Sequence, residues 1–66
     1  MAVPNVEYDV MTVLQSKLEA VAVYDKYIQD CEQAGDRECR ELIEEIKKDD
    51  ARHAERLRTQ LKRLIA

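Results

Sequence analysis

The sequence predicts an all-α fold: an antiparallel hairpin of two long helices, at about 6–34 and 37–65, that self-associates into a four-helix bundle. Composition is the first reason, because 45% hydrophobic and 38% charged residues, with one glycine and one proline, are typical of long amphipathic helices. The second reason is a pair of apolar stripes with helical spacing, and the third is the single glycine between them. We therefore expect one helical domain over residues 1–66.

The first predicted helix rests on apolar residues that recur at steps of three, four or seven. At about 100° per residue, such positions fall on one side of a helix. They are Val10, Leu14, Val21, Tyr24, Ile28 and Cys31, and the stripe is widened by Met11, Val13, Leu18 and Ala20. Asn5 follows Pro4 just before the stripe, so we expect its side chain to cap the helix N-terminus.

The turn is predicted from "AGD" at residues 34–36. Gly35 is the only glycine, and glycine is favoured just past a helix end because it tolerates positive φ. Asp36 is expected to cap the second helix by accepting a hydrogen bond from a free amide. The stripe of this second helix comprises Cys39, Ile43, Ile46, Leu57, Leu61 and Leu64, with Leu42 and Ala54 at its borders.

Self-association is expected because both stripes are wider than the seam of a two-helix coiled coil. A hairpin offers each stripe only one partner helix, and a chain below roughly 70 to 80 residues rarely stabilises a fold alone. Pairing two hairpins would cover both stripes, so the sequence predicts a homodimer or larger homo-oligomer. A monomeric antiparallel coiled coil is the alternative.

Charge and hydropathy argue against several classes of partner. The net charge of −3, with mixed signs, argues against nucleic acid. No run approaches the roughly 20 apolar residues that span a membrane, and the first ten residues lack the basic start and apolar run of a signal peptide. A cytoplasmic protein is therefore the default expectation. Cys31 and Cys39 form no CxxC pair, which argues against zinc, and we expect free thiols, with a disulfide as the alternative.

Polar residues interrupt both stripes at the same distance from the turn. Counted outward from the turn, residue 50 faces about residue 21 and residue 53 faces about residue 18. Asp50 and His53 therefore share a level with Lys17, which lies at the centre of the first stripe, one heptad before Tyr24. We expect a polar layer in which Lys17 pairs with Asp50, within one hairpin or across the dimer, with His53 hydrogen-bonded nearby. Tyr24 is expected to bond a polar partner through its hydroxyl.

Two segments, "LEAVAVYDKY" and "AGDRECRELIEEIKKDDARHAERL", resemble the ferritin-like superfamily, and are most similar to its encapsulated-ferritin and rubrerythrin-like branches. The resemblance covers about residues 14–61. It implies antiparallel hairpins that pair into a ferritin-like four-helix bundle, an iron-oxidising (ferroxidase) site between subunits, and an encapsulating shell as a partner. In such bundles, glutamates and a Glu-x-x-His motif hold two irons through oxygen and imidazole ligands.

The resemblance implies roles for individual residues. His53 matches the family histidine, and Asp50 replaces the glutamate three residues earlier, one methylene shorter but still a hard oxygen ligand. Tyr24 matches the tyrosine of the first helix, and Lys17 stands where the bridging glutamate would be. Glu19 matches an acid linked to metal entry, and at about 200° from Lys17 around the helix it should face outward or toward another subunit.

Two functions from different classes fit these residues. The first is ferritin-like iron binding or iron oxidation at an altered site between subunits, with Asp50, His53 and Glu19 as candidate metal ligands. The second is a metal-free structural or assembly module on the same scaffold, with a Lys17–Asp50 ion pair in place of the metal. Charge balance favours the second, because two lysines and two aspartates in a dimer leave no net charge for a metal to neutralise.

Overall fold

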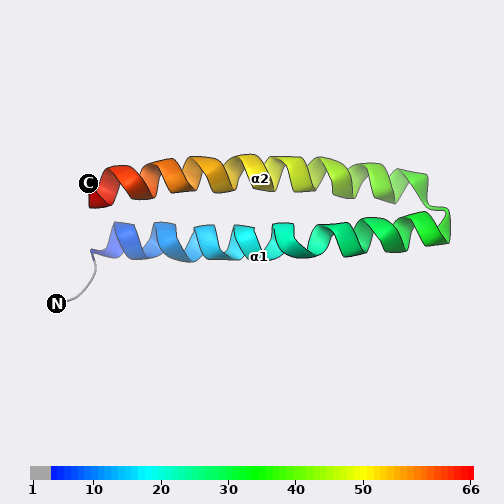
Figure 1. Cartoon of the computed structure of the whole chain (residues 1–66), viewed down its shortest axis with the longest axis horizontal. Coiled ribbons are helices and arrows are strands. Elements are labelled where there is room, and N and C mark those ends of the chain that lie inside the picture. Colours follow the sequence, from blue (N-terminus) through cyan, green and yellow to red (C-terminus); the bar gives the residue numbers. More distant parts are fainter. Residues whose placement is uncertain (1–3) are drawn as a thin grey trace.

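Two antiparallel helices of similar length make up the computed structural model, which describes residues 4–66 (Figure 1). Helix α1 spans Asn5–Ala34 and helix α2 spans Arg37–Ile65, so the predicted hairpin is confirmed, with a difference of one residue at the start of α1. Within this range, neither helix carries an apolar stretch long enough to cross a membrane. Residues 1–3, part of the stretch from which the sequence predicts no signal peptide, lie outside the described range.

The turn between the helices forms as the sequence predicts. Gly35 has φ 71° and ψ 20°, the left-handed conformation that glycine adopts without steric cost. The amides of Gly35 and Asp36 donate to the carbonyls of Glu32 and Cys31, at 3.1 Å and 2.9 Å, which is the pattern of a Schellman motif. Asp36 Oδ1 also accepts a hydrogen bond of 3.0 Å from the Cys39 amide, so this residue caps α2. The two helices are therefore reversed within two residues.

The start of α1 differs from the sequence prediction. Asn5 is the first helical residue rather than the cap, and no side chain caps this end. Pro4, with φ −52° and ψ 141°, precedes the helix, and its carbonyl accepts from the Tyr8 amide at 3.0 Å. Because Asn5 already has helical geometry, its side chain cannot take the capping position, which lies one residue earlier.

The helices meet along a narrow seam of residues spaced alternately three and four apart, as in the a and d positions of a coiled coil. Except for Ala20, Glu44 and His53 beside it, every half-buried or buried residue of the two helices lies in the seam. The seam comprises Glu7, Val10, Leu14, Lys17, Val21, Tyr24, Ile28 and Cys31 of α1, and Arg40, Ile43, Lys47, Asp50, Ala54, Leu57, Leu61 and Leu64 of α2.

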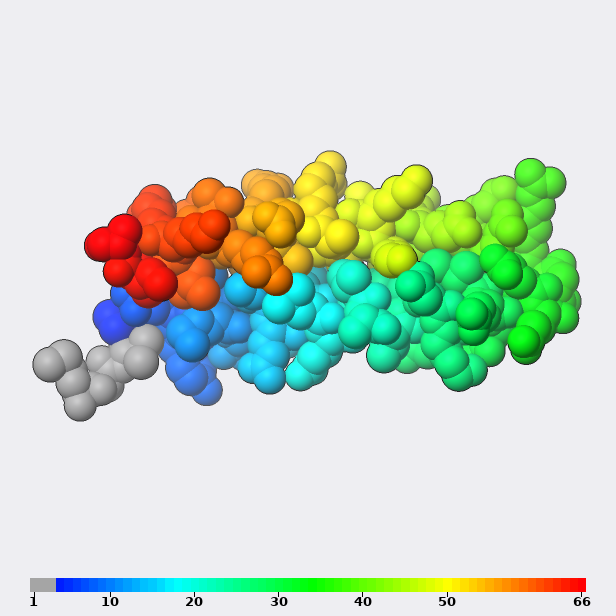
Figure 2. All heavy atoms as spheres, viewed as in Figure 1, coloured from blue at the N-terminus to red at the C-terminus, as the bar shows by residue number. Residues whose placement is uncertain are grey.

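The hairpin buries little apolar surface by itself. Ala54, at 4% exposure, is the one buried hydrophobic residue among residues 4–66, and ten large hydrophobic side chains in that range are 39% to 63% exposed. The molecule is a rod of 52 × 18 × 12 Å, with the turn at one end, and with the start of α1 and the end of α2 at the other, which we call the open end. Figure 2 shows the two helices side by side along the rod, each facing solvent on the side in view.

Candidate functional site

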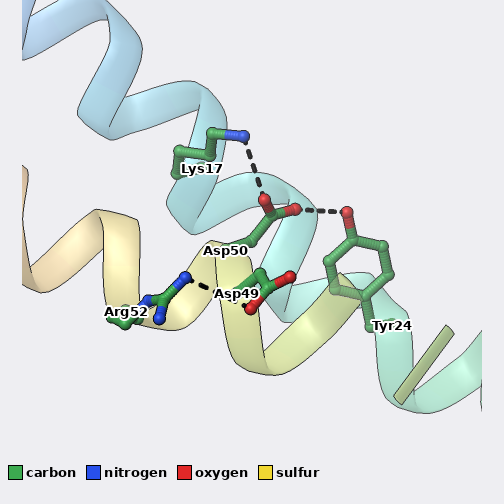
Figure 3. A network of polar contacts seen from close by, with 5 residues as sticks. All are labelled: Lys17, Tyr24, Asp49, Asp50 and Arg52. Carbon is green, nitrogen blue, oxygen red and sulfur yellow. Dashed lines mark hydrogen bonds and ion pairs between the residues drawn. The ribbon is translucent and has the colours of Figure 1, made fainter. Parts of the chain in front are cut away.

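Three side chains of the seam meet at Asp50 (Figure 3). Lys17 Nζ donates a hydrogen bond to Asp50 Oδ1 at 2.9 Å, and the Tyr24 hydroxyl donates one to Asp50 Oδ2 at 2.5 Å. Lys17 and Tyr24 are one heptad apart on α1, so they approach Asp50 from the open end and from the turn end of the rod. We call Lys17, Tyr24 and Asp50 the Asp50 cluster.

Hydrogen bonding reinforces the ordinary charge states of Asp50 and Tyr24 at neutral pH. The bonds from Tyr24 and then Lys17 lower the pKa of Asp50, which is 9% exposed, below its ordinary value of 3.8. The bond to Asp50 also raises the pKa of Tyr24 above 10.0, because the phenol would lose its acceptor partner on ionisation. The cluster is therefore an ammonium, a carboxylate and a neutral phenol, and each carboxylate oxygen already accepts one hydrogen bond.

His53 lies one helical turn beyond Asp50 on α2, beside the seam rather than in it. It is half-buried and lines an open hollow with Arg56, Leu57 and Gln60. Within residues 4–66 its side chain makes no hydrogen bond, so the bond expected in the polar layer does not form in the hairpin. Lys17 and Tyr24 reach Asp50 through the seam, whereas the His53 ring flanks it.

Glu19 lies away from the Asp50 cluster, on the exposed side of α1. Its carboxylate accepts a hydrogen bond of 3.3 Å from Gln15 Nε2, one turn earlier on the same helix. Across residues 4–66, no group of three or more His, Cys, Asp or Glu side chains is arranged to hold a metal ion. The structure thus brings Asp50 close to Lys17 and Tyr24, and does not bring Glu19 to Asp50 and His53.

The donor set of one hairpin does not fit a two-iron centre of the ferritin-like kind. Such a centre needs carboxylates that bridge the metals and imidazoles that complete their coordination. Asp50 is the one carboxylate in the cluster, and both of its oxygens are engaged by hydrogen bonds. Lys17 adds an ammonium 2.9 Å from that carboxylate, where a second anion would be required. A cation at this level would be repelled by the lysine before it met a sufficient number of oxygen ligands.

Two further basic side chains of the seam pair with acidic residues beside it, and the spacing of apolar residues alone did not predict these pairs. Lys47 Nζ lies 2.5 Å from Asp25 Oδ1, and Arg40 lies 3.9 Å from Glu32 and 3.7 Å from Glu44. The signal was present in the sequence, because basic residues at seam positions of α2 face acids that directly follow seam positions of α1. Long basic side chains can lie along a seam while their charged ends reach solvent, so they do not interrupt the coiled coil.

Both cysteines lie next to the turn as free thiols, which is the state that the sequence predicts, rather than in the alternative disulfide. Cys31 is half-buried and Cys39 is exposed. A hydrogen bond with Asp36 raises the pKa of the Cys39 thiol, since the neighbouring carboxylate disfavours a thiolate. Because the thiolate is the reactive form, this environment does not activate Cys39 as a nucleophile.

Comparison with known proteins adds no relative from which a role could be transferred. No family model, curated protein or solved structure matches the chain. The features that bear on function are therefore the exposed apolar flanks of the hairpin and the Asp50 cluster in its seam.

Proposed function

We propose that this chain is a structural assembly module, a helical hairpin that pairs with further copies of itself into a four-helix bundle. The observation that carries the proposal is the exposure of ten large hydrophobic side chains beside a seam that buries only one hydrophobic residue among residues 4–66. A monomer would leave these side chains in water, and the hydrophobic effect favours any arrangement that covers them.

The exposed area supports a partner of the chain's own size. The accessible surface is 5327 Å², whereas a compact monomer of 7.7 kDa would expose about 4300 Å². The excess of about 1000 Å² is close to the roughly 800 Å² that each partner contributes to an interface of standard size. The radius of gyration of 15.3 Å likewise exceeds the roughly 11 Å of a compact 66-residue domain.

The Asp50 cluster favours one alignment wherever α1 of one copy meets α2 of another, where no turn fixes the pairing. An apolar seam alone tolerates several pairings of similar energy, whereas a half-buried charge needs its partner opposite. Lys17 and Tyr24 satisfy Asp50 in one arrangement of the two helices only. We propose that the cluster serves helix alignment in the place where the ferritin-like proteins hold iron.

Sedimentation velocity or light scattering across micromolar concentrations tests the proposed assembly. We expect a mass of at least twice the 7.7 kDa of one chain, with high helical content by circular dichroism. A helical, cooperatively unfolding monomer over the whole concentration range would refute the proposal and favour the monomeric coiled coil.

Iron binding at the contact between subunits is a second candidate, and the observation in its favour is the pairing of an ionised Asp50 with His53 one turn away. A dimer would bring two such pairs, acceptable ligands for ferrous iron, together with two lysines that oppose it. We therefore expect weak or no iron binding by the natural sequence and tighter binding by Lys17→Glu, which removes the ammonium and adds a carboxylate.

Anaerobic titration with ferrous iron, followed by exposure to air, separates the two candidates. Lys17→Gln is the matched control, because it removes the charge without supplying a carboxylate. A tight, oxygen-reactive two-iron site in the natural protein would make iron oxidation the better proposal. Equal binding by Lys17→Glu and Lys17→Gln would show that an added carboxylate at this level is not a metal ligand.

A further inference from the structure

The exposed apolar side chains fall on two sides of the seam, which differ in charge. In heptad terms, one flank consists of the g positions, each directly before an a residue of the seam, and the other consists of the e positions, each directly after a d residue. Antiparallel pairing places the g positions of both helices on one side of the seam and the e positions of both helices on the other side. Asp25 of α1 lines one hollow together with Glu44 and Ala51 of α2, which shows this for the second flank. The first flank comprises Val6, Val13, Ala20, Tyr27, Cys39, Ile46, His53 and Gln60, and with the adjacent Val23 and Leu42 we call it the neutral face.

The neutral face is apolar over most of the rod. Along the flank itself, His53 is the one acidic or basic side chain, whereas the outer row that holds Val23 and Leu42 also carries Asp9, Asp30, Asp49, Arg56 and Arg63. The neutral face holds six of the ten exposed large hydrophobic residues of the described chain, and their exposure runs from 39% for Ile46 to 57% for Val6. Ala20 and His53 lie near its middle, and Ala20 is small enough to let a neighbouring helix approach closely. Covering the flank would remove apolar surface from water while the charged side chains of the outer row stay at the edge of the contact.

The opposite flank is less suited to burial. Its turn half carries Asp25, Glu32 and Glu44, and Asp25 is paired with Lys47 at 2.5 Å while its side chain remains 74% exposed. Its apolar residues gather at the open end, around a largely apolar groove that is lined by Met11, Leu14, Gln15, Leu18, Glu19, Ala22 and Leu61. A copy docked along this whole flank would have to desolvate several carboxylates for a shorter apolar contact.

We infer that a second copy of the chain docks on the neutral face and runs antiparallel to the first, so that each turn end lies over the other's open end. The inference rests on the proposed self-association, and it adds the face on which the copies dock and their relative direction. Direction follows from charge: residues 20–51 carry a net charge of −5 and the rest of the chain +2, which together give the −3 of the whole. Antiparallel docking sets opposite charges against each other, whereas parallel docking sets the two −5 halves side by side.

This arrangement makes His53 the centre of the contact. A twofold axis through the middle of an antiparallel pair relates each residue near mid-length to its own copy. Ala20 and His53 of both chains would therefore share one layer, with Val13, Tyr27 and Ile46 of both chains on either side of it. The half-exposed His53 ring, which has no hydrogen bond within the described hairpin, would be covered by the partner.

A matched pair of substitutions on α1 tests the docking face. Val13 on the neutral face is 44% exposed and Leu18 on the opposite flank is 39% exposed, so Val13→Glu and Leu18→Glu place the same charge at similar depth. We expect Val13→Glu to weaken self-association at least tenfold and Leu18→Glu to change it less than threefold, measured by sedimentation equilibrium. Glutamate is a better helix former than valine, so lost helical propensity would not explain the first result.

Results other than this one have distinct meanings. A monomeric natural protein would refute the proposed assembly itself. A natural oligomer that Leu18→Glu weakens as much as Val13→Glu, or more, would overturn the assignment of the face while leaving self-association intact. Circular dichroism at a concentration where each variant is associated checks that both variants remain helical.

Distance measurement between spin labels tests the direction. A label at Glu38→Cys, in a chain with Cys31→Ser and Cys39→Ser, lies on the outer side of α2 near the turn. Antiparallel docking places the two labels roughly 40 Å apart, from the helical rise over about 14 residues on each side of the centre. Parallel docking would place them within roughly 20 Å, about two interhelix spacings. A short distance would overturn the antiparallel arrangement.

Discussion

Thermal unfolding of this protein should depend strongly on its concentration, because the apolar flanks of the hairpin are covered only when copies associate. For a dimer that unfolds to two separate chains, the free energy of unfolding rises by RT times the logarithm of the ratio by which the protein concentration is increased. Raising the concentration a hundredfold, from about 2 µM to about 200 µM, therefore adds about 2.7 kcal/mol of stability per dimer. A hairpin that folds alone gains nothing from the same change.

The expected shift in midpoint follows from the size of the dimer. Two chains of 66 residues, at about 2.1 cal/mol/K per residue, unfold with an entropy of about 0.28 kcal/mol/K. Dividing the added stability by this entropy gives a rise of about 10 °C in the midpoint. Far-UV circular dichroism measures it, with path lengths chosen to keep the signal constant across the series.

A concentration-independent midpoint would refute the reasoning. If the transition were also cooperative, the narrow seam alone would be sufficient to hold the hairpin, and the exposed side chains would be tolerated in the monomer. The Val13→Glu variant supplies an internal control, since weaker association should lower its midpoint at every concentration compared with the natural protein.

Three further predictions concern the Asp50 cluster and the turn. Asp50→Leu should lower the thermal midpoint strongly, because it leaves the Lys17 ammonium without its carboxylate, and adding Lys17→Leu should restore most of the loss; an unchanged midpoint in the single variant would show that the pair does not hold this layer. Acid should weaken the fold, because the lowered pKa values of Asp36 and Asp50 contribute stability that is fully present above the ordinary value of 3.8 and is lost as pH falls through their folded values. Urea unfolding from about pH 6 to about pH 2 checks the sign, and an Asp36→Asn, Asp50→Asn double variant should lose less stability over this range. Gly35→Ala should cost about 1 kcal/mol, because φ is 71° and the left-handed region is strained for other residues. The added Cβ meets no atom within 4 Å, so a much larger loss in urea unfolding would contradict a purely backbone cause.

The hairpin was predictable because local chemistry and periodicity agree at its turn. Gly35 and Asp36 each satisfy a different requirement of the reversal, positive φ for one and a capping oxygen for the other. The start of α1 was less predictable, since Asn5 is a good cap in isolation but Pro4 already supplies the extended residue before the helix. Such boundary differences arise where two adjacent residues can both end the helix.

The width of the stripes was harder to interpret than their position. Met11 and Val13 widen the first stripe on opposite sides, as their spacing predicts, and in the hairpin both remain exposed because one partner helix can cover only the a and d positions. Matching levels placed Lys17 opposite Asp50, and their atoms lie 2.9 Å apart. The same counting could not separate the seam from its flanks, so it placed His53 in the layer, where it makes no hydrogen bond within residues 4–66.

The Asp50 cluster matters more for the alignment of helices from different chains than for the alignment of α1 and α2 within one chain. Inside a hairpin the tight turn at Gly35 already fixes which residues of α1 and α2 face each other, so the cluster adds little to that choice. When several copies meet, α1 of one chain can also pair with α2 of another, and no turn constrains that pairing. A slip of one heptad in one direction would move Asp50 from opposite Val21 to opposite Ile28, which separates it from Lys17 and leaves the half-buried ammonium unpaired. The opposite slip would keep Lys17 beside Asp50 but would break the Tyr24 hydrogen bond, so both bonds form in one alignment only. A protein that assembles through exposed apolar flanks therefore has a physical reason to keep one polar cluster in its seam: the cluster penalises slipped pairings that the apolar residues alone would accept.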